Sequence, residues 1–84
     1  MNSLFGKVYL VKNQAQSEAL QRAVLAAGGV WATDETSVVS LPHCYIFVYW
    51  GGVMTTEDPT KTAYVKSHCL PLSPLPPSLL EDNI

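Results

Sequence analysis

Charged side chains are scarce in this sequence, because only 14% of its residues are Asp, Glu, Lys or Arg, where roughly 25% is ordinary for a globular domain. The chain has five basic and seven acidic residues, without a basic cluster. Nucleic acid is therefore not an expected partner, since binding its phosphate backbone requires several cations on one face. A charge-poor chain that is 48% hydrophobic has the composition of an interface, which predicts a homo-oligomer.

The sequence also lacks a long hydrophobic stretch. Its longest apolar run, Cys44 to Met54, is far shorter than the roughly 20 residues of a membrane-spanning helix. Residues 1–5 show no basic stretch before an apolar core, so a secretion signal is not expected. We expect a cytoplasmic protein that makes no membrane contact. With 84 residues the chain has the size of one domain, whose limited burial an oligomer would increase.

Cysteine is rare, and each of the two cysteines follows a histidine, in His43-Cys44 and His68-Cys69. Neighbouring residues on a strand point to opposite faces, so such a pair does not suit a tetrahedral zinc ion. A disulfide is not expected in a reducing cytosol. The pattern therefore predicts two small buried thiols, with no metal and no other cofactor.

Catalytic motifs are missing as well. The chain has no Gly-x-Ser-x-Gly, no His-Glu-x-x-His, no P-loop and no Cys-His-Asp spacing that indicates a nucleophile with its base. We therefore expect a binding protein and not an enzyme.

Hydrophobic patterning predicts an α+β fold, in which one helix packs on one face of a small antiparallel or mixed sheet of three to five strands. Asn13, followed by Gln16, is a helix N-cap with a capping-box partner, and Gly28-Gly29 is a C-terminal stop. The segment 61–67 fits either a short helix or an edge strand. The expected strands are residues 7–11, 30–32, 37–41, 44–50 and 53–56, the expected helix is 14–27, and 33–36 is a polar turn.

The expected helix has an apolar stripe made mostly of alanine, which lets it lie close to a sheet. The stripe consists of Ala19, Leu20, Ala23, Val24 and Ala27. Glu18, Gln21 and Arg22 are then expected to face solvent or a ligand. Most prolines lie beyond residue 69, with leucines between them. This predicts a domain at 1–69 and an extended arm at 70–84, packed on the domain's own sheet or on a neighbouring subunit.

The strand expected at Cys44 to Trp50 is apolar on both faces, so it should be covered on both. Its compact face, with Cys44, Ile46 and Val48, suits the alanine-rich helix. Its aromatic face consists of Tyr45, Phe47 and Tyr49. Three possibilities remain for what covers this aromatic face. It packs against the arm, against a neighbouring subunit, or against a bound partner, which is a ligand or another protein.

Gly51-Gly52 has the composition of a two-residue hairpin turn. Such a turn would pair Tyr49 with Met54 and Phe47 with Thr56, which widens the aromatic face into a platform. The same register places the polar residues Thr55 and Glu57 beneath the helix, which fits poorly. Two alternatives remain: the register is shifted by one residue, or the return strand lies at the edge of the sheet.

An aromatic platform with few polar groups suits a planar base or an apolar partner surface. Trp31, Arg22 and His43 are candidate stacking or polar additions to it. The predicted ligand-binding residues are Tyr45, Phe47, Tyr49, Met54, Thr56, Trp31, Arg22 and His43.

Four runs of the sequence resemble a diffuse group of short bacteriophage accessory proteins. The runs are Ser17-Glu18-Ala19-Leu20-Gln21, Gly28-Gly29-Val30-Trp31, Tyr45-Ile46-Phe47-Val48 and Gly52-Val53-Met54-Thr55. The likeness covers residues 7–57, excludes the proline-rich tail, and implies a βαββ core in a phage setting, inside the host bacterial cytoplasm.

Two functions compete in that setting. In the first, the protein sequesters a host immune nucleotide signal, of the cyclic ADP-ribose type or a cyclic dinucleotide, in a pocket between subunits. Arg22, Lys12 and Lys66 are then the cations available for phosphate. In the second, the protein inhibits a host defence protein, as anti-CRISPR proteins do. The aromatic platform, the scarce charge and the expected oligomer favour the first.

Overall fold

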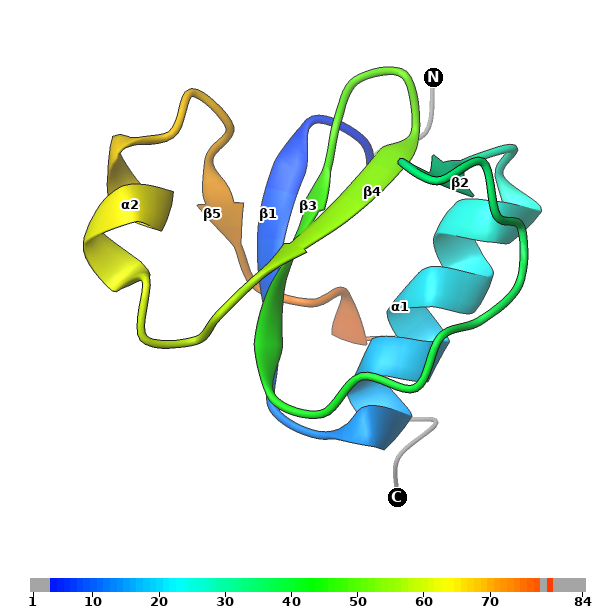
Figure 1. Ribbon diagram of the computed structural model, residues 1–84, viewed down its shortest axis with the longest axis horizontal. Helices are drawn as coiled ribbons and strands as arrows, with labels where there is room; N and C mark the ends of the chain where they lie inside the picture. Colours follow the sequence, from blue (N-terminus) through cyan, green and yellow to red (C-terminus); the bar gives the residue numbers. More distant parts are fainter. Residues whose placement is uncertain (1–3, 78, 80–84) are drawn as a thin grey trace.

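A mixed sheet lies at the centre of the computed structural model, which describes residues 4–77 and 79 (Figure 1). The elements are β1 (Lys7–Val11), α1 (Gln14–Ala26), β2 (Val30–Trp31), β3 (Cys44–Val48), β4 (Val53–Glu57), α2 (Thr62–Ser67) and β5 (Leu72–Ser73). The predicted α+β class is confirmed, with one main helix against a sheet. Within the described residues, neither helix has the length and apolar composition that crossing a bilayer requires.

The five strands follow the spatial order β2-β4-β3-β1-β5. β3 pairs antiparallel with both β1 and β4, while β5 and β2 pair in parallel at the two edges. Every residue of β3 is buried, which confirms that this strand is covered on both faces. It ends at Val48, two residues earlier than predicted.

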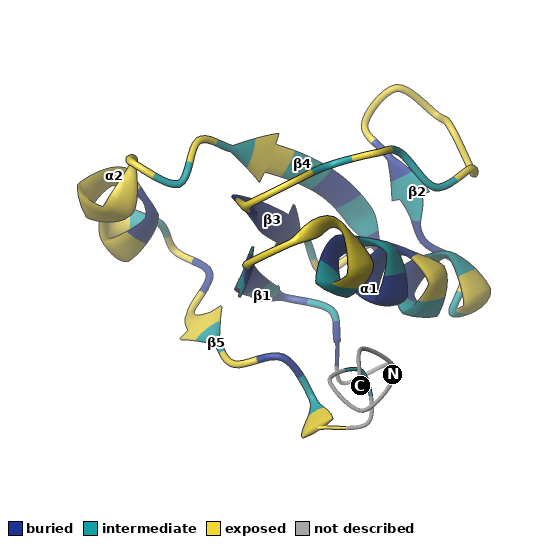
Figure 2. Ribbon diagram, turned by 90° about the horizontal axis from the view of Figure 1, so that it is seen from below, coloured by how far each residue is buried: buried dark blue, intermediate teal, exposed yellow. Residues whose placement is uncertain are grey.

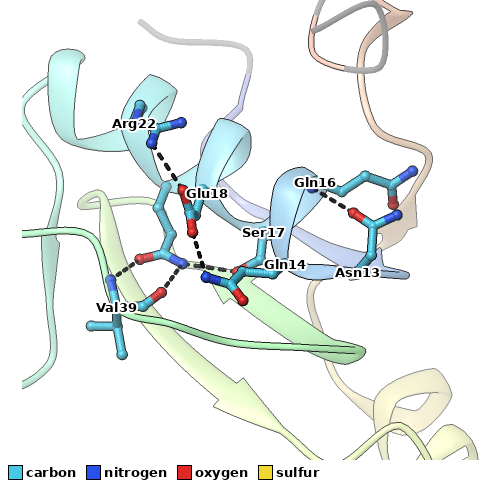
Figure 3. Close-up of polar contacts among 8 residues, drawn as sticks. Asn13, Gln14, Gln16, Ser17, Glu18, Arg22 and Val39 are labelled. Atoms are coloured by element: carbon cyan, nitrogen blue, oxygen red, sulfur yellow. Dashed lines mark hydrogen bonds and ion pairs between the residues drawn. The ribbon is translucent and has the colours of Figure 1, made fainter. Parts of the chain in front are cut away.

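α1 begins at the predicted residue and ends at Ala26, one residue before the predicted end. The Asn13 side chain accepts the Gln16 backbone N–H at 2.9 Å (Figure 3). The Gln16 side chain accepts the Lys12 N–H at 2.9 Å. At the other end, Gly28 has a φ of 95°, a left-handed conformation that glycine adopts readily. The Gly29 N–H then bonds the Val24 carbonyl at 2.9 Å, as in a Schellman end.

α1 covers the compact face of the sheet, as expected. Its buried side turns toward the strands (Figure 2). Leu20 and Val24 on this helix are fully buried. They belong to one core cluster with Ile46, Val48 and Met54. Burying side chains of this size contributes about 1.5–3 kcal/mol each, so this cluster is the main core of the fold.

The aromatic face is covered by the chain itself. The segment that fitted either a helix or a strand forms α2, on the opposite side of the sheet from α1 (Figure 1). Val65 of α2 and Leu70, which follows it, are 1% and 4% exposed and pack with Tyr45 and Phe47. Beyond β5, Leu75 reaches the α1-side core. The end of the predicted arm lies outside the described residues.

The hairpin between β3 and β4 differs from the prediction by one residue. Tyr49 pairs with Val53, since its N–H donates to the Val53 carbonyl at 2.9 Å, so the loop has three residues and not two. The Gly52 N–H bonds the Tyr49 carbonyl at 2.8 Å, and Gly52 has a φ of 84°. This is a turn followed by a left-handed bulge residue. Met54 consequently pairs with Val48 and lies on the α1 side.

The strand predicted at residues 37–41 is wrong. Residues 32–43 form a loop without strand pairing, which runs back along α1 (Figure 1). Val39 and Leu41 are half-buried against the α1-side core. The apolar pattern therefore reflects packing onto the helix and not a place in the sheet.

Candidate functional site

The structure divides the predicted site residues between the two faces of the sheet. Tyr45 and Phe47 are 4% and 2% exposed beneath α2, while Tyr49 is half-buried beside them. Met54 and Thr56 lie on the other face, because they pair with Val48 and Ile46 in the one-residue-shifted register. The predicted platform that joined these two groups is therefore wrong.

The aromatic face is occupied by its own ring contacts. The His68 ring lies edge-on to Phe47, with centroids 4.6 Å apart, and 5.8 Å and 6.0 Å from the rings of Tyr49 and Tyr64. The Tyr45 hydroxyl bonds the Thr62 hydroxyl at 3.2 Å. Tyr64 and His68 were missed as partners of this face because their segment had no clear periodicity.

Three of the predicted residues do meet on the other face. Trp31, Met54 and Thr56 line a cavity of about 300 Å³. It lies between the 32–43 loop and the edge of β4 that faces away from β3. We call it the Trp31 cavity. Its remaining lining residues are Ala32, Thr33, Glu35, Val39, Leu41 and Thr55. The floor is apolar, and the polar groups lie at the rim.

The Trp31 indole has a buried donor without an acceptor. The residue is 7% exposed, and within the described part of the chain its Nε1 has no hydrogen-bond partner. Leaving a buried donor unsatisfied costs about 1–3 kcal/mol. Buried polar groups are nearly always paired, so this unpaired donor is an exception, and it belongs to a residue that lines the cavity.

A side-chain clamp holds the loop that forms one wall of the cavity. Gln21 of α1 is fully buried, whereas the sequence predicted that it faces solvent or a ligand. Its Oε1 accepts the Val39 N–H at 2.7 Å, and its Nε2 donates to the Val39 carbonyl and to the Ser17 hydroxyl, both at 2.8 Å (Figure 3). Gln21, Val39 and Leu41 were missed as site residues, although the apolar spacing of the last two was a usable signal.

The start of the loop turns sharply beside the indole. The Trp31 N–H donates to the Glu35 carbonyl at 2.9 Å, and the Asp34 N–H donates to the Trp31 carbonyl at 2.8 Å. Asp34 has a φ of 68°, a region that aspartate enters more readily than most residues. This turn places Thr33 and Glu35 at the rim, where the Thr33 hydroxyl donates to the Glu35 carboxylate at 3.1 Å.

The charges near the Trp31 cavity do not suit phosphate. Glu35 is its one charged lining residue among those described, and Lys and Arg are absent from the lining. Arg22 is exposed on α1 and paired with Glu18 at 2.9 Å (Figure 3). His43 is exposed ahead of β3 and is not a lining residue. The predicted polar additions therefore do not converge on the cavity.

A second hollow of about 450 Å³ lies at the other edge of the sheet, between Lys12, Leu10 and the residues from Leu72 to Leu75. It is the larger of the two and contains one of the cations predicted to bind phosphate. Lys12 is exposed, and a single exposed cation does not define an anion site.

The cysteines are not paired with each other. Cys44 is buried, as predicted, and burial raises the pKa of its thiol. Cys69 is exposed, which contradicts the expectation of two buried thiols, because the chain after α2 turns outward before Leu70 is buried. Across residues 4–77 and 79, no cluster of three or more His, Cys, Asp or Glu side chains could hold a metal ion.

The Trp31 cavity is thus the described site best suited to a ligand. Its volume is at the small end of ligand pockets, and its apolar floor with a few rim polar groups is typical of sites for small flat molecules. The chain matches no protein-family model, no curated protein and no solved structure.

Proposed function

We propose that this protein is a binding protein that sequesters a small nucleotide signal by holding its base in the Trp31 cavity. The observation that carries the proposal is the apolar cavity that Trp31 lines, together with the buried indole N–H of the same residue, which has no partner among the described residues. A base offers a flat surface for contact with the cavity lining, and ring-nitrogen or carbonyl acceptors that this donor would reach if the indole turned toward the cavity.

The cavity constrains which part of a nucleotide it holds. A volume of about 300 Å³ accommodates a base with its sugar more readily than a whole dinucleotide. Because the described lining has no Lys or Arg, phosphates would remain in solvent. The proposed ligands are host immune signals of the cyclic ADP-ribose type or cyclic dinucleotides, with one base inserted. Phage origin and the bacterial cytoplasm belong to this proposal.

Tryptophan fluorescence tests the proposal directly. The chain has two tryptophans, and the second, Trp50, is 64% exposed at the hairpin. Trp50→Phe therefore leaves Trp31 as the single reporter. Titration of this variant with cyclic ADP-ribose, ADP-ribose, cyclic di-AMP, cyclic di-GMP and adenosine should change its emission for at least one ligand, with calorimetry giving the same Kd. Absence of binding across the panel contradicts the proposal.

A cavity variant and a variant on the opposite face separate specific binding from surface contact. Trp31→Phe keeps an aromatic ring but removes the N–H, so we expect calorimetric affinity to fall by about tenfold. Tyr64→Ala, beneath the other face of the sheet, should bind as the wild type does. Equal losses in both variants would point to a general effect on the fold.

Inhibition of a host defence protein is the second candidate function. Trp50 and Tyr64 are 64% and 51% exposed, and both residue types are enriched among interface hot spots. A partner captured from bacterial lysate should then be lost with Trp50→Ser or Tyr64→Ser and kept with Trp31→Phe. The reverse pattern supports the cavity instead. The predicted homo-oligomer stays a prediction, which sizing chromatography tests.

A further inference from the structure

β4 has an open edge beside the Trp31 cavity. The Tyr49 N–H bonds the Val53 carbonyl, so the backbone groups of Val53, and of every second residue after it, point toward β3. Those of Met54 and Thr56 therefore point away from β3. The Met54 carbonyl confirms this direction, because it accepts the Ala32 N–H at 3.1 Å.

β2 is too short to cover this edge completely. It pairs only at Val53 and Met54, and no described residue pairs with Thr56 on the outer edge. Thr56 is exposed and lines the Trp31 cavity. One N–H donor and one C=O acceptor of the same residue are thus presented side by side at the cavity rim.

We infer that Thr56 reads the hydrogen-bonding edge of the base. This inference rests on the proposed function. A backbone N–H and C=O in this arrangement complement any flat ring that carries an adjacent acceptor and donor, as the Watson–Crick edges of adenine and uracil do. For adenine, the Thr56 N–H donates to ring nitrogen N1, and the exocyclic amino group donates to the Thr56 carbonyl.

An added peptide strand fits this edge less well. Strand addition uses successive outward-facing residues along an edge, whereas here β2 already covers Met54, Thr56 is open, and β4 ends at Glu57. A single open residue beside a cavity of about 300 Å³ suits one small ring. The site therefore recognises a base with an unmodified Watson–Crick edge. Cyclic ADP-ribose itself is excluded by this inference, because its adenine N1 is bonded to ribose, whereas cyclic dinucleotides and relatives with a free N1 are not.

Matched nucleoside pairs test the inference with the Trp50→Phe protein. Adenosine should bind more tightly than N6,N6-dimethyladenosine, which lacks the amino donor, by a factor of about ten or more. Uridine should likewise bind more tightly than 3-methyluridine. Equal binding within both pairs overturns the inference and leaves the proposed function standing. Failure of every nucleoside and nucleotide to bind overturns the proposed function itself.

The Thr56 amide gives a second, residue-specific readout. Adenosine should shift its NMR signal and slow its hydrogen exchange, while the Thr60 amide, already bonded to Asp58 at 2.8 Å, should not change. Thr56→Pro removes the N–H from an outward-facing edge position, where proline is tolerated, and should weaken adenosine binding by about tenfold. If adenosine binds and the Thr56 amide neither shifts nor gains protection, the inference is wrong.

Discussion

The side-chain amide of Gln21 bonds the backbone of Val39 in the way that a neighbouring strand would. This amide accepts the Val39 N–H at 2.7 Å and donates to the Val39 carbonyl at 2.8 Å, which are the two bonds that a paired strand would make. The amide therefore holds the 32–43 loop against α1. Because the loop forms one wall of the Trp31 cavity, the clamp couples a buried helix position to the shape of the site.

Gln21→Ala should lower the free energy of unfolding by about 1–3 kcal/mol, since it removes bonds to partly buried groups and leaves a small void. Gln14→Ala is the matched control, because Gln14 is exposed on the same helix and bonds only the Glu18 carboxylate among the contacts described. Its effect should be below about 0.5 kcal/mol. Urea denaturation measures both, and equal losses would contradict the clamp.

Gly52→Ala should be more harmful than Gly51→Ala. Gly52 has a φ of 84°, and a Cβ there would lie 2.9 Å from the Phe5 ring and 3.1 Å from Gly29 Cα, whereas a Cβ at Gly51 meets nothing within 4 Å. We expect a loss of about 1–3 kcal/mol for Gly52→Ala from strain and crowding. Gly51→Ala should stay within about 0.5 kcal/mol. Thermal denaturation of both variants tests the three-residue loop. A two-residue turn, in which both glycines have positive φ, predicts similar losses of stability for the two variants.

The same hairpin shows where prediction from sequence ends. Two glycines after an apolar strand indicate a turn, but they do not determine whether Trp50 belongs to the strand or to the loop. That one-residue choice moves Met54 from the aromatic face to the α1 side. The cavity residues Trp31, Met54 and Thr56 were named as site residues, yet Met54 and Thr56 were predicted on the wrong face.

Local signals predicted α1 and the strand β3 because capping, spacing and apolar alternation act over a few residues. The Gln21 clamp could not be predicted in this way. Gln21 and Val39 are 18 residues apart, and glutamine on a helix is ordinarily solvent-facing. Likewise, α2 has six residues, and a helix this short is stabilised by packing against the aromatic face and not by its own sequence.

The two thiols should differ in reactivity. Cys69 is exposed, while Cys44 is buried and its thiol pKa is raised by desolvation; the reactive form of cysteine is the thiolate. Ellman's reagent should therefore titrate one thiol quickly in the folded protein and two in urea. Cys69→Ser should abolish the rapid reaction, and Cys44→Ser should retain it. Two rapidly reacting thiols in the native protein would contradict the burial of Cys44.

Tyr9 should make the fold sensitive to alkaline pH. Its side chain is 1% exposed, its hydroxyl donates to the Leu4 carbonyl at 2.8 Å, and desolvation raises its pKa above the ordinary value of 10.0. As the pH rises, the unfolded chain therefore loses this proton before the folded chain does. The stabilising contribution is complete below about pH 10 and is lost as the pH rises through the folded-state pKa.

Tyr9→Phe separates the two roles of this hydroxyl. At pH 7 the variant should be less stable by about 1 kcal/mol, because it loses a buried hydrogen bond and leaves the Leu4 carbonyl with one donor fewer. Above pH 10 its free energy of unfolding should fall less steeply than that of the wild type, so the two curves converge. Urea titrations between pH 7 and 11 measure both slopes. Parallel slopes would show that Tyr9 does not cause the alkaline loss, since a phenylalanine cannot release a proton.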